Sequence, residues 1–223
     1  MSVQSSVVPL SSAVPTTARR VTGFVRIAAA LTLAFALGFQ IVEKTVHNDL
    51  VPSEYFSFFT IQVSIIAIVV LFAGGMVALR HPTDSAAYTT IRMSVLAYAI
   101  MTAVVYNLLL RGLPDTGFVA SAWPGEIMHV WIPIVMALDW LLAPGRARLR
   151  FGALVIVLIY PVAWLLYTFV RGAIVGWYPY PFLEPSTGLP SVAAYIGAIF
   201  VFVLIVAVVA IALSRLGSPK SRD

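Results

Sequence analysis

The stretch "YFSFFTIQVSIIAIVVLFAGGMVAL", residues 55–79, decides the fold class because it holds 25 residues without a charged side chain. A helix needs about 20 mainly apolar residues to cross the hydrocarbon core of a bilayer. The rest of the chain has the same character: 61% of its 223 residues are hydrophobic, 10% are charged and its mean hydropathy is +0.97. Soluble domains carry roughly 25% charged residues, so lipid must be the solvent for most of this chain.

Five further apolar runs, separated by breakers that contain proline and glycine, predict an all-α, polytopic membrane protein with six transmembrane helices. The expected spans are 22–42, 55–79, 92–110, 126–143, 151–170 and 191–213. They form a transmembrane domain over residues 21–214. Residues 1–20, rich in Ser, Val, Pro and Thr, are expected to be a disordered cytoplasmic tail, and residues 215–223 a second cytoplasmic tail.

The basic residues predict how these spans are oriented. With the N-terminus inside the cell, 11 of the 14 basic residues fall on the inner side and three, Lys44, Arg111 and Arg171, on the outer side. The positive-inside rule therefore places both termini in the cytoplasm. An Arg-Arg pair before an apolar run also resembles a signal peptide. The run continues to Val42 and no good cleavage site follows, so we expect the first span to be retained.

Composition and motifs argue against several kinds of site. The chain has no cysteine, which excludes disulfides, thiolate metal sites and a cysteine nucleophile. It has no phosphate-binding loop, dinucleotide fingerprint or zinc-protease motif, so no cofactor is expected. The three histidines, His47, His81 and His129, fall on an outer loop, an inner loop and a span, where they are not expected to share a metal. A net charge of +5 fits orientation in a membrane better than nucleic-acid binding.

Polar side chains gather near the outer ends of four spans, and this asymmetry is the main functional signal. They are Ser57, Thr60, Gln62 and Ser64 in the second span, Asn107 and Arg111 in the third, Glu126 and His129 in the fourth, and Tyr167, Thr168 and Arg171 in the fifth. Ser57, Thr60 and Ser64 have the spacing of one helix face. A polar side chain that faces lipid costs a few kcal/mol, so we expect these groups to share one cavity beneath the outer surface.

Each of these residues also has a purely structural interpretation. A threonine in a membrane helix commonly bonds the carbonyl one turn back, which for Thr60 is that of Phe56. A histidine or an asparagine such as His129 or Asn107 can join two helices by a hydrogen bond. Arginines near span ends can simply extend to the membrane surface. The sequence leaves both interpretations open.

Three features bear on the architecture around this layer. Asp139, at the inner end of the fourth span, is expected to form a salt bridge with Arg92 or with an arginine of the following loop. Pro133 and Pro161 should kink their helices and free carbonyl groups that neighbouring helices satisfy. The loop "GWYPYPFLEPSTGLP", residues 176–190, fits either an aromatic belt at the membrane surface or a lid above the polar layer.

Four segments resemble the bacterial Pr6Pr family of integral membrane proteins: "YFSFFTIQ" (55–62), "MHVWIPIVMALDWLL" (128–142), "YPVAWLLYTFVRG" (160–172) and "GWYPYPFL" (176–183). The resemblance runs from the first span to the sixth and implies a multi-pass protein of the bacterial inner membrane. The chain departs from the family pattern at Val63-Ser64, where the family has Ser-Asn.

The Pr6Pr family is distantly similar to the eukaryotic FAR-17a/androgen-induced family. Members of the FAR-17a/androgen-induced family are six-span hydrolases of fatty-acid esters that use a threonine nucleophile and a histidine in separate helices. This resemblance implies that Thr60 and His129 are catalytic. An imidazole can take the proton of a threonine hydroxyl, and polar donors can stabilise the oxyanion. The candidate oxyanion or substrate-binding residues are Asn107, Arg111, Gln62, Glu126 and Tyr167, with Glu126 expected to orient His129.

Two other functions fit the same sequence. One is non-enzymatic binding or transport of a lipid or another small hydrophobic molecule in the polar cavity. The other is an accessory role in a membrane complex. The expected partners are membrane lipids and a small hydrophobic substrate, with no nucleic acid. The sequence does not predict the oligomeric state.

Overall fold

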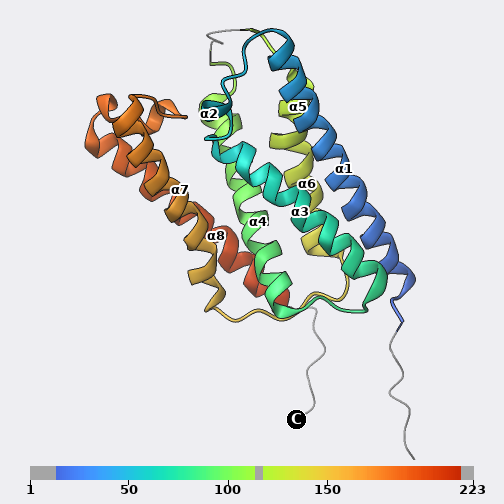
Figure 1. Ribbon diagram of the computed structural model, residues 1–223. Coiled ribbons are helices and arrows are strands. Elements are labelled where there is room, and N and C mark those ends of the chain that lie inside the picture. The colour runs from blue at the N-terminus through green and yellow to red at the C-terminus, as the bar shows by residue number, and fades with distance from the viewer. Residues whose placement is uncertain (1–13, 114–117, 217–223) are drawn as a thin grey trace, which may run out of the picture.

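A computed structural model describes residues 14–113 and 118–216, and this part of the chain is all-α (Figure 1). Six of its helices are long and apolar enough to cross a membrane, which confirms the prediction of a six-span protein. These spans are Thr17–Val46 (α1), Phe59–Arg80 (α3), Ala86–Leu110 (α4 with η1), Ala122–Leu142 (α5, η2 and α6), Ala153–Val175 (α7) and Leu189–Leu216 (α8).

Two of the spans are composite. The third consists of α4 (Ala86–Val105) and the π-helix η1 (Tyr106–Leu110), and the fourth of α5 (Ala122–Glu126), the π-helix η2 (Ile127–Trp131) and α6 (Ile132–Leu142). The connections hold three short elements, namely α2 (Pro52–Tyr55) and the 3-10 helices η3 (Pro181–Leu183) and η4 (Pro185–Thr187).

Several expected boundaries were wrong. The first helix begins at Thr17, inside the stretch expected to be a tail, because the side chain of Thr16 caps it by accepting a hydrogen bond from the Arg19 amide. The last helix continues to Leu216. Residues 1–13 and 217–223 of the two expected tails lie outside the described residues.

The second span also begins later than expected, at Phe59. Ser57 lies in the turn between α2 and α3, so it does not share a helix face with Thr60 as the spacing predicted. A short helix with proline at its first position precedes this turn. The aromatic residues 55–58, expected to begin the second span, therefore belong to the connection that precedes α3.

Because the six spans alternate in direction, the bundle has two chemically different ends. We call the end that holds Thr17, Arg80 and Leu216 the arginine-rich end, since Arg19, Arg26 and Arg92 lie in its helical turns. We call the opposite end, which holds residues 47–58, 111–113, 118–121 and 176–188, the loop end. The predicted cytoplasmic side is the arginine-rich end.

Helices α1 and α3 approach each other closely at two glycines. A Cβ atom on Gly75 would lie 2.5 Å from Cγ1 of Ile27 and 2.8 Å from the carbonyl oxygen of Gly23. A Cβ atom on Gly23 would lie 2.8 Å from Cγ of Leu79. Lipid gives helices no hydrophobic reason to associate, so small residues that allow backbones to approach are a main source of packing energy.

Helix α4 lies at the centre of the bundle, and its side chains hydrogen-bond carbonyls that prolines leave free. Pro161 has no N–H, so the Val157 carbonyl one turn earlier in α7 has no helical donor. The Tyr98 hydroxyl donates to it at 2.7 Å. Pro133 frees the His129 carbonyl in the same way, and the Asn107 amide donates to it at 3.4 Å. These pairs confirm that neighbouring helices hydrogen-bond the carbonyl groups that the two prolines leave free.

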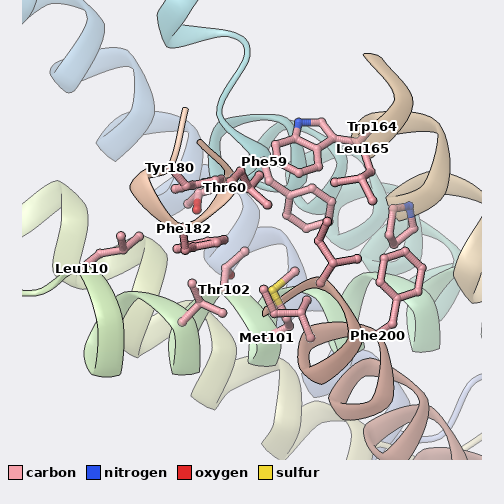
Figure 2. A pocket seen from close by; sticks show the side chains of 15 residues that line it. Phe59, Thr60, Met101, Thr102, Leu110, Trp164, Leu165, Tyr180, Phe182 and Phe200 are labelled. Carbon is pink, nitrogen blue, oxygen red and sulfur yellow. The ribbon is translucent and has the colours of Figure 1, made fainter. Parts of the chain in front are cut away.

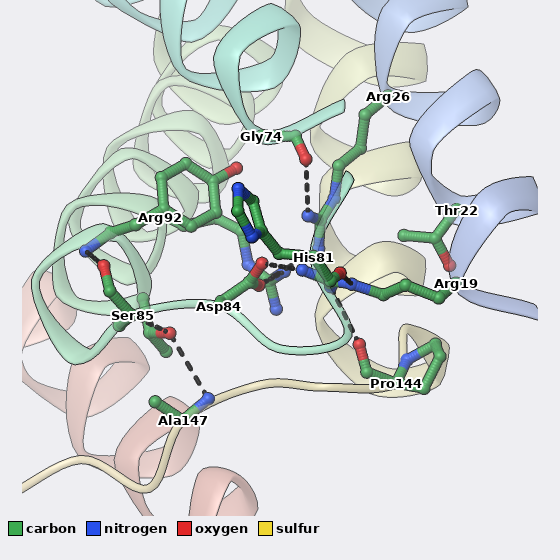
Figure 3. A network of polar contacts seen from close by, with 12 residues as sticks. Arg19, Thr22, Arg26, Gly74, His81, Asp84, Ser85, Arg92, Pro144 and Ala147 are labelled. Carbon is green, nitrogen blue, oxygen red and sulfur yellow. Dashed lines mark hydrogen bonds and ion pairs between the residues drawn. The ribbon is translucent and has the colours of Figure 1, made fainter. Parts of the chain in front are cut away.

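At the arginine-rich end, a buried ionic cluster joins α1, α4 and α6 to the connection between α3 and α4, and Figure 3 shows the part of it around Asp84. Asp84 lies in the connection between α3 and α4, and its fully buried carboxylate contacts Arg19, Arg26 and Arg92. Asp139 of α6 accepts from Nε of Arg26 at 2.9 Å and lies 3.5 Å from Nη1 of Arg92. The predicted pairing of Asp139 with Arg92 is therefore present, while Arg26 was not foreseen.

The cluster has more positive than negative groups, and the Trp140 ring stabilises part of the excess positive charge by cation–π contacts. The guanidinium of Arg92 lies 4.9 Å from the centre of the Trp140 ring, and that of Arg146 lies 5.1 Å from the same ring. Indole faces attract cations, which stabilises the guanidinium nitrogens that have no hydrogen-bond acceptor. The Trp140 N–H donates to the Ala210 carbonyl of α8 at 3.2 Å, so the ring also ties α6 to α8.

The α1–α3 contact yields a first prediction. We expect Gly75→Ala to lower the free energy of unfolding by about 1–3 kcal/mol, because the new methyl group overlaps Ile27 and the backbone of Gly23. The measurement is thermal unfolding of the purified protein in detergent. Gly38→Ala in the same α1 helix is the control, since nothing lies within 4 Å of its added Cβ. Equal melting temperatures for the two variants would contradict this packing.

The ionic cluster yields a second prediction. We expect Asp84→Asn to destabilise the protein by about 3–5 kcal/mol, because it leaves buried arginines without their carboxylate. Asp49→Asn is the comparison, because the Asp49 carboxylate pairs with Lys44 at a partly exposed position. Thermal unfolding of both variants should show a much larger loss for Asp84→Asn, and a smaller loss there would refute a stabilising cluster.

Candidate functional site

A partly enclosed cavity lies between α3, α4, α7 and α8 near the loop end, and we call it the α7–α8 cavity (Figure 2). Its wall consists of Phe59, Thr60, Met101, Thr102, Val105, Leu110, Pro161, Trp164, Leu165, Tyr180, Phe182, Leu183, Ile196, Ile199 and Phe200. No acidic, basic or histidine side chain is on this wall. The cavity is therefore almost wholly apolar.

The cavity is narrow. About 560 Å³ of space lies between its wall atoms, part of it open to the outside, but only about 60 Å³ is wide enough for the centre of a water molecule. A slender apolar group fits such a space better than a compact polar one.

Most polar groups of the wall are already paired within the protein. The Thr102 hydroxyl donates to the Ala99 carbonyl at 3.0 Å, and the Trp164 N–H donates to the Ser57 carbonyl at 3.0 Å. The Tyr180 hydroxyl accepts from the Thr60 amide at 3.4 Å. The wall therefore offers a ligand mainly apolar surface.

The loop that follows α7 closes the cavity at the loop end. Tyr180 and Leu183 are buried, although they lie in a connection, and the Tyr180 ring stacks on Phe182 with centroids 5.2 Å apart. Burial raises the pKa of Tyr180, so its hydroxyl stays neutral. The Arg171 guanidinium lies 4.7 Å from the ring of Trp177, which holds the start of the loop. The loop therefore packs against the bundle and lines the cavity, whereas an aromatic belt would only lie at the membrane surface.

A second depression lies on the opposite face of α4, between α4–η1 and η2–α6, and we call it the α4–α6 groove. It is lined by Ile100, Ala103, Val104, Asn107, Leu108, His129, Val130, Pro133, Ile134 and Ala137. It holds about 920 Å³ of space, including space open to the outside. His129 and Asn107 are its two strongly polar side chains.

Two π-helical turns, η1 and η2, carry these polar residues. The His129 ring stacks on Tyr106 with centroids 3.9 Å apart and an interplanar angle of 12°. Its Nδ1 lies 2.9 Å from the Gly125 carbonyl oxygen. The Asn107 amide nitrogen donates to the carbonyls of Ala103 and His129, at 2.8 and 3.4 Å. Single π-helical turns within helices are frequent at functional sites.

The structure does not bring Thr60 and His129 together. Thr60 lines the α7–α8 cavity and His129 lines the α4–α6 groove, with α4 between them. Each makes its hydrogen bond elsewhere, Thr60 with Tyr180 and His129 with Gly125. The polar groups expected to share one cavity are thus divided between two faces of α4. Their proposed catalytic roles remain untested.

The other candidate residues have structural partners. Gln62 does reach another helix, since its carbonyl oxygen accepts from the Tyr160 hydroxyl at 2.6 Å, and its amide donates to the Phe56 carbonyl at 2.8 Å. The Tyr167 hydroxyl lies 2.8 Å from Ser57 Oγ and is on the wall of neither depression.

The expected contact between Glu126 and His129 does not form. Glu126 instead accepts from Arg111 at 2.6 Å in a partly exposed ion pair. A backbone carbonyl takes the place expected for the carboxylate on His129. The reason is the π-helical turn, which begins directly after Glu126 and changes the i, i+3 geometry assumed from the sequence.

Sequence reasoning missed the aromatic wall of the α7–α8 cavity and the ionic cluster. Tyr180 was assigned to the loop as a belt or a lid, and Trp164 was not singled out, because apolar composition does not distinguish a cavity wall from a core. For the ionic cluster a signal was present. Arg19 and Arg26 are seven residues apart, which places them on one helix face.

Comparison with known proteins leaves the functional argument to this geometry. No protein-family model, no curated protein and no solved structure matches the chain. What is established is a multi-pass, six-helix membrane protein with two depressions on opposite faces of its central helix.

Proposed function

We propose that the protein binds the hydrocarbon chain of a single-chain lipid in the α7–α8 cavity. The observation that carries this proposal is the chemistry of the wall: it is narrow and almost wholly apolar, and it carries no charged side chain. A cavity of this kind gains free energy when an apolar ligand fills it and gains little from water.

The position of the cavity supports a ligand that enters from the bilayer. Its wall includes Leu165 of α7 and Ile196 and Ile199 of α8, helices whose outer faces are largely exposed and therefore face lipid. Tyr180 and Phe182 close the end nearest the membrane surface. In this proposal they act as a plug that keeps water out while a chain occupies the space below.

The same wall favours binding over hydrolysis. A threonine hydroxyl becomes a nucleophile only when a base takes its proton. The wall around Thr60 supplies no histidine, carboxylate or amine. The candidate base, His129, lies on the other face of α4. Ester hydrolysis, supported by the resemblance to the Pr6Pr and FAR-17a/androgen-induced families, is therefore the competing proposal.

Membership of the Pr6Pr family rests on the four quoted segments alone. The location in a bacterial inner membrane, with the arginine-rich end in the cytoplasm, rests on that resemblance and on the distribution of basic residues. An accessory role in a membrane complex would show itself as a partner that copurifies with the full chain.

Quenching of tryptophan fluorescence by a dibrominated fatty acid tests chain binding. We expect a saturable part of the quenching in detergent solution to come from Trp164, because its ring is on the cavity wall. This part should disappear in Trp164→Phe. If Trp164→Phe retains the saturable part, the chain does not bind in this cavity.

A pair of variants on one helix tests the position of the chain. We expect Ile199→Phe to weaken binding by about tenfold, or about 1.4 kcal/mol, because the larger ring fills the cavity. Val201→Phe is the matched control, since Val201 is 58% exposed on the same helix and is not on the wall. Equal affinities for the two variants would contradict the proposal.

The competing hydrolase proposal has its own test. We expect a fluorophosphonate probe to leave Thr60 unlabelled, and we expect Thr60→Ala and His129→Ala to hydrolyse long-chain esters no more slowly than the unmodified protein. The reason is that no hydrogen bond connects the two side chains. Labelling that is lost in Thr60→Ala would instead support the hydrolase.

A further inference from the structure

We propose that the α4–α6 groove is a second, separate lipid site, which binds an amphiphile through hydrogen-bond donors on its headgroup. This inference does not rest on the α7–α8 cavity, because α4 separates the two. Its basis is a pair of hydrogen-bond acceptors, on His129 and Asn107, that find no partner within the described part of the protein and share one groove wall.

The first acceptor is Nε2 of His129. A carbonyl oxygen can only accept, so the contact of Nδ1 with the Gly125 carbonyl places a hydrogen on Nδ1. In a neutral imidazole the other nitrogen, Nε2, is then an acceptor. The side chain is nine-tenths buried and lies on the groove wall, and among the described residues no donor reaches Nε2. An unpaired acceptor at this depth in a membrane costs free energy.

The second acceptor is the side-chain oxygen of Asn107. Both hydrogens of its amide nitrogen have acceptors, in Ala103 and in the carbonyl that Pro133 leaves free. The amide nitrogen therefore performs a structural task that also fixes the orientation of the side chain. The oxygen is left without a donor in the part of the chain that the structure describes.

The surroundings hold both acceptors in place. Tyr106 stacks on the His129 ring, and the Arg111 guanidinium lies 5.4 Å from the centre of the Tyr106 ring. Glu126 holds Arg111 by its ion pair. The imidazole is thus fixed by a stack and a hydrogen bond before any ligand arrives, which reduces the entropy lost on binding.

The groove also has the polarity pattern of an amphiphile. The acceptors lie toward the loop end, while Ile100, Ala103 and Ala137 form an apolar floor toward the membrane centre. From Asn107 to Ile100 the helix rises about 10 Å, which matches a short run of methylene groups. The positive charge of Arg111 is already paired with Glu126, and two neutral acceptors select hydroxyl or amide donors, since an acceptor has no hydrogen to give to an anionic group.

The test uses the fact that the chain has only three histidines. In the background His47→Gln with His81→Gln, ¹⁵N-labelled histidine gives imidazole signals from His129 alone. Both replaced side chains are exposed and lie outside the groove. The protein is placed in phosphatidylcholine nanodiscs, because that headgroup has no hydrogen-bond donor. NMR then reports whether Nε2 accepts a hydrogen bond.

Two lipids with the same chain serve as probes, monooleoylglycerol with donor hydroxyls and methyl oleate without donors. We expect monooleoylglycerol to shift the Nε2 resonance saturably in the direction of an accepted hydrogen bond, and methyl oleate to leave it unchanged. No shift with either lipid, or the same shift with both, would overturn the proposal. This comparison needs no variant in the groove, so it stands even if such a variant fails to fold.

A matched pair of variants then locates the site. Ala103→Phe fills the floor of the groove and is expected to abolish the shift, whereas Ala198→Phe, exposed on α8 and on neither wall, should retain it. Quenching at Trp164 by the dibrominated fatty acid should be unchanged in Ala103→Phe. A shift that persists in a folded Ala103→Phe protein would place the lipid elsewhere and refute the groove.

Discussion

The bilayer core offers no hydrogen-bond partner, so every polar group that enters it must be paired by the protein itself. Prolines make this constraint acute, because each one leaves a carbonyl free one turn earlier. The third span meets the demand on two sides, with Tyr98 of α4 bonded to the Val157 carbonyl and Asn107 of η1 bonded to the His129 carbonyl. The positions of α7 and of the η2–α6 segment both depend on this one helix.

That arrangement also explains why depressions lie on two opposite faces of α4. Met101, Thr102 and Val105 of α4 face the α7–α8 cavity, while Ala103 and Val104 face the α4–α6 groove. A helix that lies between two proline-containing neighbours has to pack against both of them with different faces. The α7–α8 cavity and the α4–α6 groove therefore both arise where α4 packs against a neighbouring helix that contains a proline.

The two ends of the bundle are held by different forces. At the arginine-rich end, charges and close glycine contacts fix the helices. Gly145, with φ of +80°, lets two connections pack so closely that an added Cβ atom would lie 2.5 Å from the Pro82 carbonyl oxygen. A residue with a Cβ atom is strained in that conformation. At the loop end the ion pairs are partly exposed, and the buried closing contacts are ring stacks and single hydrogen bonds. Space for a ligand is accordingly found at the loop end.

The sequence predicts the part of this structure that depends on composition. Apolar runs of sufficient length predicted six spans, and the Pro133 and Pro161 positions predicted carbonyls that other helices satisfy. It could not predict how the polar residues divide, because spacing along a helix does not say which neighbour a side chain meets. Thr60 and His129 were expected at a similar depth, but they line depressions on opposite faces of α4. The π-helical turn after Glu126 cannot be predicted from the spacing of hydrophobic residues along the sequence.

The buried cluster of Arg19, Arg26 and Arg92 with Asp84 and Asp139 has a formal charge of +1, from three cations and two anions. Moving one elementary charge through a membrane potential of about 100 mV changes the free energy by about 2.3 kcal/mol. The two ways of inserting this bundle are therefore unequal in an energised membrane. The voltage itself favours the insertion that leaves the cluster on the electrically negative side.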